Sequence, residues 1–357
     1  MNVHSEILSA LEREDHIILA TIVATSGSTP AAIHSKMLVT NGGTTSVGTV
    51  GGGCMEGEVI LHANRLYNAG KAEILTFELN EDDIESGLIC GGNLDILLEP
   101  VTKNDIPLVK QLQTLRDDGV DCLLATLLTP EGSVAWKQVV LMTDDSVKAL
   151  ASTIPHLSKE LDTAIEKAYK KLETQRIELP FGELIIEPLQ GTPDCIIFGG
   201  GHVSKFVTQS AAMVGFRVTI VDDREKYSNP SRFPDAAQTI VSDFAEAFSK
   251  LTIKPTSYIV IVTRGHSYDE MVLEHAVKTP AKYIGMIGSK RKILATYEHL
   301  VARGVPAEKL KHVFAPIGID IASVTAEEIG ISIVAELIRV RRGAKQSLWH
   351  LSENLVF

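Results

Sequence analysis

Apolar and polar residues alternate in blocks along the second half of the chain, and the blocks have the lengths of strands and helices. Short apolar, β-branched runs typical of buried strands are separated by longer segments whose apolar residues recur at helical spacing. The predicted strands are residues 195–198, 217–221, 239–241, 258–262, 283–287 and 313–314, and the predicted helices are residues 203–214, 269–277, 290–303 and 326–341. Strands that alternate with helices predict a parallel sheet covered on both faces.

The first half of the chain has a different pattern, in which strands outnumber helices. Strands are predicted at residues 17–24, 36–40, 45–50, 72–78, 94–99, 121–128, 134–142 and 181–188, and helices at residues 3–12, 55–69, 106–118 and 158–175. Asn41-Gly42-Gly43 is a turn-forming cluster that predicts a hairpin between two of these strands. Pro100 is expected to end the first compact block. This half is therefore predicted to be a mixed α/β domain.

A glycine turn joins the first strand of the second half to its helix. Gly199, Gly200 and Gly201 stand between them, and Asp222 closes the next strand about 20 residues further on. Glycines at this position let the backbone approach a ligand, the helix start attracts a phosphate, and the acid suits a ribose hydroxyl. We predict a pocket for a nucleotide or dinucleotide. The alternative, glycine for packing only, stays open because Ser204 replaces the third small residue of the motif.

These patterns predict an α/β protein of two domains. Residues 1–190 form the mixed N-terminal domain, residues 191–343 a Rossmann-like nucleotide-binding domain, and residues 344–357 a tail. Ligands of a parallel sheet bind beyond the carboxyl ends of its strands, where the loops 199–202, 263–266, 288–290 and 315–320 are expected.

Composition narrows the classes of function. The 357 residues are long enough for about two cores, and 45% hydrophobic with 22% charged residues is ordinary for a soluble protein. A net charge of -11 without a long basic run argues against nucleic acid as the main partner. Neither a membrane span nor a signal peptide is predicted. Four cysteines without metal-site spacing suit a reducing cytoplasm, which is the expected location.

Other residues of the second domain add polar groups to the predicted cleft. Gly288, Ser289 and Lys290 open a basic helix start that could bind phosphate, or could be only a solvated basic face. His202 follows the glycine turn, and His266 has Asp269 nearby. We expect these histidines to face the cleft and to bind a ligand rather than transfer protons.

Two cysteines of the first domain are framed by glycines. Cys54 follows Gly51-Gly52-Gly53 at a predicted helix start with Glu56 just inside, and Cys90 precedes Gly91-Gly92. A helix start stabilises a thiolate, which the glutamate opposes in part, and the alternative for each cysteine is a buried apolar role. Cys122 and Cys195 lie in apolar strands and are expected to be core residues. Ser26, Gly27 and Ser28 could cradle an anion or form an ordinary surface turn.

Taken together, these motifs resemble the XdhC/CoxI family, the xanthine dehydrogenase accessory proteins of bacteria. The resemblance spans nearly the whole chain in the family's order, although the family usually has alanine at the place of Gly200 and often glycine at that of Ser204. The motifs that carry it are residues 25–30, 51–57, 90–92, 198–203, 215–218, 221–224, 283–285, 288–292 and 315–321.

The resemblance implies a carrier or chaperone for the molybdenum cofactor, in its molybdopterin or dinucleotide form, rather than a turnover enzyme. Such a protein would hold the cofactor while a cysteine desulfurase supplies sulfur, and would deliver it to the apo-form of a xanthine dehydrogenase-type enzyme. Cys54 and Cys90, with Glu56, would handle sulfur and could contact molybdenum. The residues expected to bind the cofactor are Ser26, Gly27, Ser28, Gly52, Gly53, Gly199, Gly200, Gly201, His202, Asp222, Arg224, His266, Gly288, Ser289 and Lys290.

Two other hypotheses remain at this point. An NAD(P)-dependent oxidoreductase would use the glycine turn and Asp222, but it leaves the glycine-framed cysteines without a role. A scaffold that joins the desulfurase to the dehydrogenase would bind no cofactor. The apolar closing helix also makes a homodimer an expectation.

Overall fold

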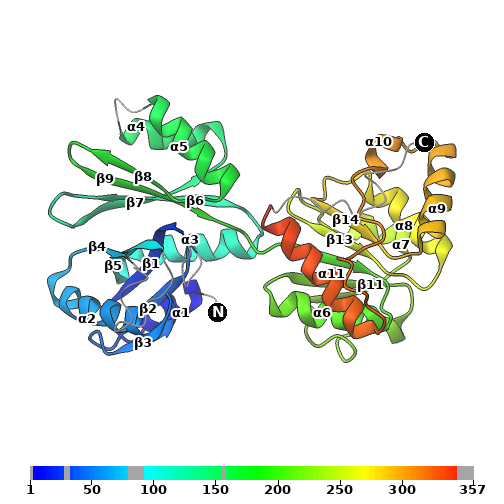
Figure 1. Cartoon of the computed structure of the whole chain (residues 1–357), viewed down its shortest axis with the longest axis horizontal. Helices are drawn as coiled ribbons and strands as arrows, with labels where there is room; N and C mark the ends of the chain where they lie inside the picture. Colours follow the sequence, from blue (N-terminus) through cyan, green and yellow to red (C-terminus); the bar gives the residue numbers. More distant parts are fainter. Residues whose placement is uncertain (1–2, 28–32, 79–91, 155–157, 344–357) are drawn as a thin grey trace. The chain divides into compact units, whose positions relative to one another are not determined.

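A computed structural model describes residues 3–27, 33–78, 92–154 and 158–343 of the chain. The chain divides into two compact units, Met1–Gly191 and Thr192–Phe357 (Figure 1). Each unit has its own sheets and its own hydrophobic core.

The first unit contains a five-stranded antiparallel sheet in the order β3-β2-β1-β5-β4. Alternate residues of its central strand face opposite sides, as the period of a strand requires. Ile18 and Ala20 pack with the helix α2, whereas Ile17 and Leu19 pack with α1 and α3. The elements are α1 (Val3–Leu11), β1 (His16–Ser26), β2 (Lys36–Thr40), β3 (Thr45–Gly48), α2 (Gly53–Ala69), β4 (Glu73–Glu78), β5 (Asn93–Thr102) and α3 (Ile106–Asp117).

A second antiparallel sheet of this unit has the order β7-β6-β9-β8. The helices α4 and α5 cover one face, with Leu150 and Leu161 in the core beneath them. A smaller apolar cluster that includes Val23 and Ile185 joins this sheet to the first one. The elements are β6 (Cys122–Leu128), β7 (Val134–Leu141), α4 (Asp144–Thr153), α5 (Ser158–Lys171), β8 (Gln175–Leu179) and β9 (Gly182–Leu189).

The second unit is a parallel sheet in the order β12-β11-β10-β13-β14. The helices α6 and α11 cover one face, and α7, α8 and α9 cover the other (Figure 1). Consecutive residues of β10 divide between the two cores, because the sheet is buried on both sides. The elements are β10 (Asp194–Phe198), α6 (His202–Met213), β11 (Arg217–Asp222), β12 (Gln238–Val241), α7 (Phe244–Lys250), β13 (Tyr258–Ile261), α8 (His266–Ala276), β14 (Tyr283–Met286), α9 (Lys290–Ala302), α10 (Ala307–Leu310) and α11 (Ala326–Arg341).

The predicted fold class is confirmed, including the parallel sheet of the second half. The expectation for Pro100 was wrong, because β5 continues through it to Thr102. Pairing between β4 and β5 ends at Leu98 of β5. Pro100 therefore lies beyond the β4–β5 ladder, and its missing N–H removes no hydrogen bond from that ladder. The helix predicted at residues 158–175 ends at Lys171, and β8 takes its last residue. The short helices α4, α7 and α10 were not predicted.

Within the residues that the structure describes, no helix is long and apolar enough to cross a membrane.

Candidate functional site

The three glycines of the turn have different surroundings. Gly199 has φ +107°, and a Cβ there would lie 2.4 Å from the Val262 carbonyl oxygen. A Cβ on Gly200 would lie only 1.8 Å from the carbonyl oxygen of Tyr227. A Cβ on Gly201 would meet no described heavy atom within 4 Å. The protein's own packing therefore requires the first two glycines, and the third borders open space.

The start of α6 is available to an anion. Gly201 is its N-cap, and among the described residues no side chain caps its first N–H groups. His202 is the first residue of the helix and is exposed. Ser204 is buried, and its hydroxyl donates to the Gly199 carbonyl, which ties the turn to the helix. Unsatisfied N–H groups and the helix dipole favour negative charge at this point.

Asp222 lies inside the protein at the end of β11. The residue is 1% exposed. Its carboxylate accepts hydrogen bonds from the Gly200 N–H at 2.8 Å, the Arg224 N–H at 3.1 Å and the Arg224 Nε at 2.9 Å. Both oxygens thus hold protein groups, and the assignment of Asp222 to a ribose hydroxyl stays a prediction.

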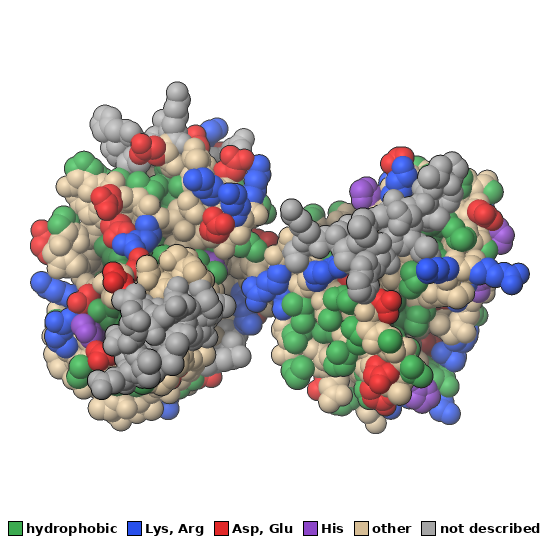
Figure 2. Space-filling view, in the orientation of Figure 1, with side chains coloured by type: hydrophobic (Ala, Val, Ile, Leu, Met, Phe, Trp, Pro, Cys, Tyr) green, Lys and Arg blue, Asp and Glu red, His purple; other side chains and the backbone are tan. Residues whose placement is uncertain are grey.

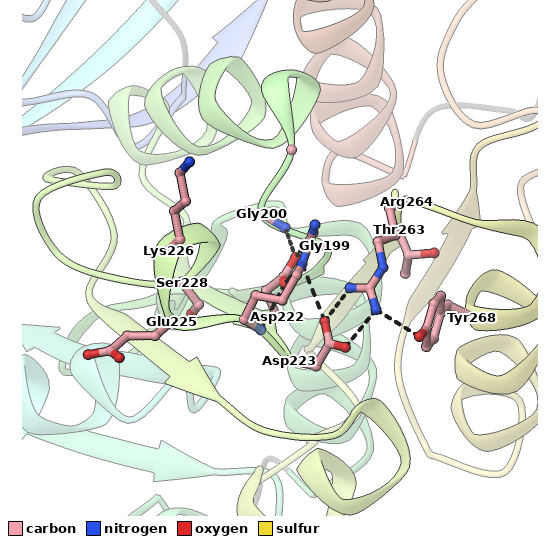
Figure 3. Close-up of polar contacts among 12 residues, drawn as sticks. Gly199, Gly200, Asp222, Asp223, Glu225, Lys226, Ser228, Thr263, Arg264 and Tyr268 are labelled. Carbon is pink, nitrogen blue, oxygen red and sulfur yellow. Dashed lines mark hydrogen bonds and ion pairs between the residues drawn. The ribbon is translucent and has the colours of Figure 1, made fainter.

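An ion pair joins the loops that follow β11 and β13 (Figure 3). Arg264 donates from Nη2 to Asp223 Oδ2 at 2.8 Å and to the Tyr268 hydroxyl at 2.7 Å, and from Nη1 to Asp223 Oδ1. Hydrogen bonding to Arg264 lowers the pKa of Asp223 below its usual value. Because β11 and β13 flank β10 in the sheet, this pair connects the loops on either side of the glycine turn.

Two further guanidinium groups lie at the turn. Arg224 stacks on the Tyr227 ring, 3.8 Å from its centroid. Arg232 donates to the Gly200 carbonyl at 2.9 Å and to the Gly201 carbonyl at 3.4 Å. Arg232 and the Asp223–Arg264 pair were not among the predicted site residues. No local motif marks Arg232, since it is 31 residues from Gly201 and reaches the turn only in the folded chain.

An acidic residue partly neutralises the basic start of α9. Lys292 lies 2.8 Å from Asp269, whose side chain is fully buried and also accepts from Thr263 Oγ1 at 2.6 Å. Ser289 caps α9 by accepting the Lys292 N–H at 3.4 Å, and Lys290 is exposed. His266 begins α8, is exposed, and lies 3.3 Å from Thr296 Oγ1 through Nδ1. The carboxyl end of β13 is followed by His266, and that of β14 by Gly288, Ser289 and Lys290. These residues therefore lie at the same edge of the sheet as the glycine turn.

In the first unit, Cys54 is exposed in the first turn of α2. Gly52 is the N-cap of this helix, and a Cβ on Gly52 or Gly53 would meet no described heavy atom within 4 Å. The Glu56 carboxylate accepts from Thr49 Oγ1 at 2.5 Å. Among the described residues, none blocks the approach to Gly52 and Gly53 before this exposed cysteine.

The other predicted residues of the first unit divide into three groups. Ser26 ends β1 and Gly27 follows it in the left-handed region with φ 70°, whereas Ser28 and Cys90 lie outside the described residues. Cys122 and Cys195 are buried as predicted, and burial raises the pKa of each thiol to about 12. In the described part of the chain, no three His, Cys, Asp or Glu side chains gather as a metal site would require.

Comparison with known proteins identifies the family. Residues 195–337 match the XdhC Rossmann domain, and residues 10–78 match the XdhC and CoxI family. The two ranges together cover more than half of the chain. The protein belongs to the XdhC and CoxI family. The glycine turn and the Asp223–Arg264 pair lie in the XdhC Rossmann domain, and Cys54 lies in the other matched range.

Two of the individual relatives extend the likeness over nearly the whole chain. A Bacillus subtilis (strain 168) protein, named as a probable subunit of xanthine dehydrogenase, is 25% identical over 349 residues, which are 96% of this chain and 98% of that protein. The uncharacterized protein YqeB of Escherichia coli (strain K12) is 31% identical over 157 residues, 44% of this chain and 29% of that protein. A crystal structure of a xanthine dehydrogenase from Bacillus halodurans has the same fold, with a TM-score of 0.76 at 24% identity over 99% of this chain and all of that one.

Proposed function

We propose that this XdhC/CoxI-family protein is an accessory protein that matures a xanthine dehydrogenase-type molybdenum hydroxylase. Family membership and the Bacillus subtilis relative, which matches 96% of the chain, support a role tied to xanthine dehydrogenase. In this proposal the protein holds the molybdenum cofactor during sulfuration and then passes it to the apo-enzyme.

The observation that carries the proposal is the open start of α6, which no described side chain caps. Gly201 leaves room for a ligand, and the helix offers N–H groups. Arg224 and Arg264, which pair with Asp222 and Asp223, follow the carboxyl ends of β11 and β13 at the same edge of the sheet. These groups fit the phosphate-bearing end of a pterin cofactor. His202, His266 and the loop 288–290 would add hydrogen-bond donors. When bound, the cofactor supplies a molybdenum centre held by a dithiolene, which is the chemistry that the target enzyme needs.

The Asp223–Arg264 pair gives this proposal a charge-specific test. A ligand phosphate competes with Asp223 for the Arg264 guanidinium. Phosphate binding is therefore weakened by the free energy needed to break the Asp223–Arg264 ion pair. Asp223→Asn should strengthen retention of the cofactor several-fold, and Arg264→Gln should weaken it. The readout is the dissociation constant for released cofactor, measured by pterin fluorescence. Equal dissociation constants for the two variants and the wild type would show that the phosphate end of the cofactor does not bind at this site.

In the first unit, Cys54 is the candidate for handling sulfur. Its thiol is exposed at a helix start, where a desulfurase could reach it, and sulfur is a soft ligand that suits molybdenum. Cys90 is the second candidate by its sequence. Cys54→Ser and Cys90→Ser should leave pterin retention at the wild-type level and lower the activity of the matured dehydrogenase. A double variant that matures the enzyme normally would contradict this role.

The decisive experiment purifies the full chain from a host that makes the cofactor. Mass spectrometry of released small molecules and metal analysis should find a pterin and molybdenum with the wild type, and less of both with Gly201→Val, whose side chain would fill the open space. Lys205→Gln on the exposed face of α6 is the control. Wild-type protein that retains neither pterin nor molybdenum would contradict cofactor binding.

The β-α-β unit with its glycine turn also supports an NAD(P)-dependent oxidoreductase as a second candidate. Titration with NADH separates the two, since binding at micromolar levels with turnover of a carbonyl substrate would favour the oxidoreductase. Capture of both protein partners by protein from a host unable to make the cofactor, together with no cofactor affinity, would favour a scaffold.

A further inference from the structure

A cavity of about 250 Å³ lies within the first unit, apart from every residue assigned to cofactor or sulfur. The helices α1 and α3, the start of β2 and the ends of the second sheet's strands supply its walls. Its apolar wall is formed by Val3, Leu112, Val120 and Leu189. A cavity of this size that combines an apolar wall with a few convergent polar groups is typical of a small-molecule site.

Lys36 and Arg116 line the cavity, and no acidic side chain is among its described lining residues. Lys36 lies 2.7 Å from the buried Glu187 and donates to Thr21 Oγ1 at 3.0 Å, so this charge is paired. Arg116 also lines the cavity, and its ion-pair partner Asp117 lies 3.9 Å away, at the limit of such a contact. This separation is too long for a direct hydrogen bond, so Arg116 can form a shorter charge-assisted contact with an anion in the cavity.

His4 adds a buried polar atom that has no hydrogen-bond partner among the described residues. The residue is 8% exposed and lines the cavity, and its Nδ1 makes no hydrogen bond to any described residue. Burial, with the charges of Lys36 and Arg116, lowers the pKa of His4 to about 4 against the opposing effect of Glu187 and Asp117. The imidazole is therefore neutral near pH 7 and can donate one hydrogen bond to a ligand. A buried polar atom without a hydrogen bond costs free energy, and a ligand that forms a hydrogen bond to His4 Nδ1 removes this cost.

We propose that this cavity binds a small organic anion with an apolar body. The anionic group contacts Arg116 and Lys36 and accepts a hydrogen bond from His4, and the body packs on Val3 and Leu112. The shared chemistry is a carboxylate or phosphate on a compact apolar group. This site is independent of the cofactor proposal, because it uses none of the same residues.

Isothermal titration of the full chain with three matched probes tests the proposal. Benzoate carries a carboxylate, phenyl phosphate carries a phosphate, and benzamide is the uncharged isostere of benzoate. We expect at least one anion to bind about tenfold or more tightly than benzamide. The tighter of the two anions identifies the group that the cavity recognises. Equal binding of all three probes, or no saturable binding of any, would overturn the proposal.

Variants and a spectroscopic readout place the binding in the cavity. Arg116→Gln should weaken binding of the preferred anion about tenfold, whereas Arg13→Gln, an exposed position outside the cavity, should leave it unchanged. In proton NMR, saturation with that anion should raise the pKa of His4 from about 4, because the bound charge favours the imidazolium. A His4 titration that does not change in the presence of a bound anion would put the ligand elsewhere.

Discussion

At the scale of single residues, neighbouring positions with the same amino acid have opposite roles. Gly200 packs against the backbone of Tyr227, and Gly201 borders open space. Asp222 is buried and holds the turn, whereas Asp223 is partly exposed and pairs with Arg264. The amino-acid type alone does not distinguish the roles of the two glycines, or of the two aspartates. Their roles differ because different parts of the folded chain pack next to them.

The two glycines give the first prediction. Gly200→Ala should lower the free energy of unfolding by about 2 kcal/mol or more, because its Cβ collides with a carbonyl oxygen that belongs to backbone. Gly201→Ala should cost no more than about 1 kcal/mol, the difference between glycine and alanine at an N-cap. Calorimetric unfolding of the two variants checks this. Equal losses would show that the contact with Tyr227 does not constrain the turn.

The two aspartates give the second prediction. Asp222→Asn should cost about 3 kcal/mol, because it leaves the Arg224 guanidinium and the Gly200 N–H without a buried carboxylate. Asp223→Asn should cost about 1 kcal/mol or less, since its pair with Arg264 is partly solvated. Urea denaturation of both variants measures the difference. A larger loss at Asp223 would mean that the exposed pair, and not Asp222, holds the loops together.

At the scale of elements, α11 packs on α6, the helix that follows the glycine turn, and holds it in place. Thr325 and Glu328 form a capping box at its start, in which the Thr325 hydroxyl accepts the Glu328 N–H and Glu328 accepts the Thr325 N–H. Thr325→Ala should lower the free energy of unfolding by about 1 kcal/mol. Ser249→Ala, which removes a hydroxyl bonded only within its own helix, should cost about 0.5 kcal/mol or less. A Thr325→Ala loss no greater than that of Ser249→Ala would contradict the capping role.

The helix α1 should make stability depend on pH. His4 has a pKa of about 4 in the folded protein and about 6.5 when unfolded, so the unfolded chain binds the proton more tightly. Its contribution is present above pH 6.5 and is lost as the pH falls towards 4, by about 3 kcal/mol in total. Unfolding measured from pH 7 to pH 4 should show a smaller decline for His4→Asn than for wild type. His312→Asn, at an exposed position, is the control, and parallel declines for wild type and His4→Asn would exclude His4 as the source.

Element prediction succeeded where the pattern was local and failed where neighbours decided the outcome. The helix α11 was predicted with its observed bounds, since the helical spacing of its apolar residues is a local signal. Residues 172–175 were predicted as the end of a helix, yet Gln175 begins β8, which pairs with β9. Strand pairing therefore overrode a weak helical pattern.

At the scale of the whole molecule, hydrophobic side chains gather on the face of the second unit where α6 and α11 lie (Figure 2). Met213 is 78% exposed, Val324 84% and Ile331 52%. Large exposed apolar groups gathered on one face are typical of a contact surface. We propose that a second copy of the chain covers this surface.

Sedimentation equilibrium checks that expectation. The wild type should form a dimer, and a Met213→Glu, Ile331→Glu double variant should be monomeric, because two charges would be buried without partners. Leu61→Glu places the same charge on an exposed apolar residue of α2 in the first unit and should leave the dimer intact. A monomeric wild type, or a double variant that still dimerises, would refute the homodimer at this face.

The sequence by itself determined the α/β class, the glycine turn at the start of α6 and the helix-start position of Cys54, because each follows from spacing along a short segment. The exposure of Cys54 was decided by the tertiary structure. Tertiary structure decided that Asp222 is enclosed, that Arg232 and Arg264 reach the glycine turn, and that His4, Lys36 and Arg116 meet around a cavity. Those contacts join residues far apart in the chain. No local pattern encodes them, since they depend on which strands pair and which helices pack on each face.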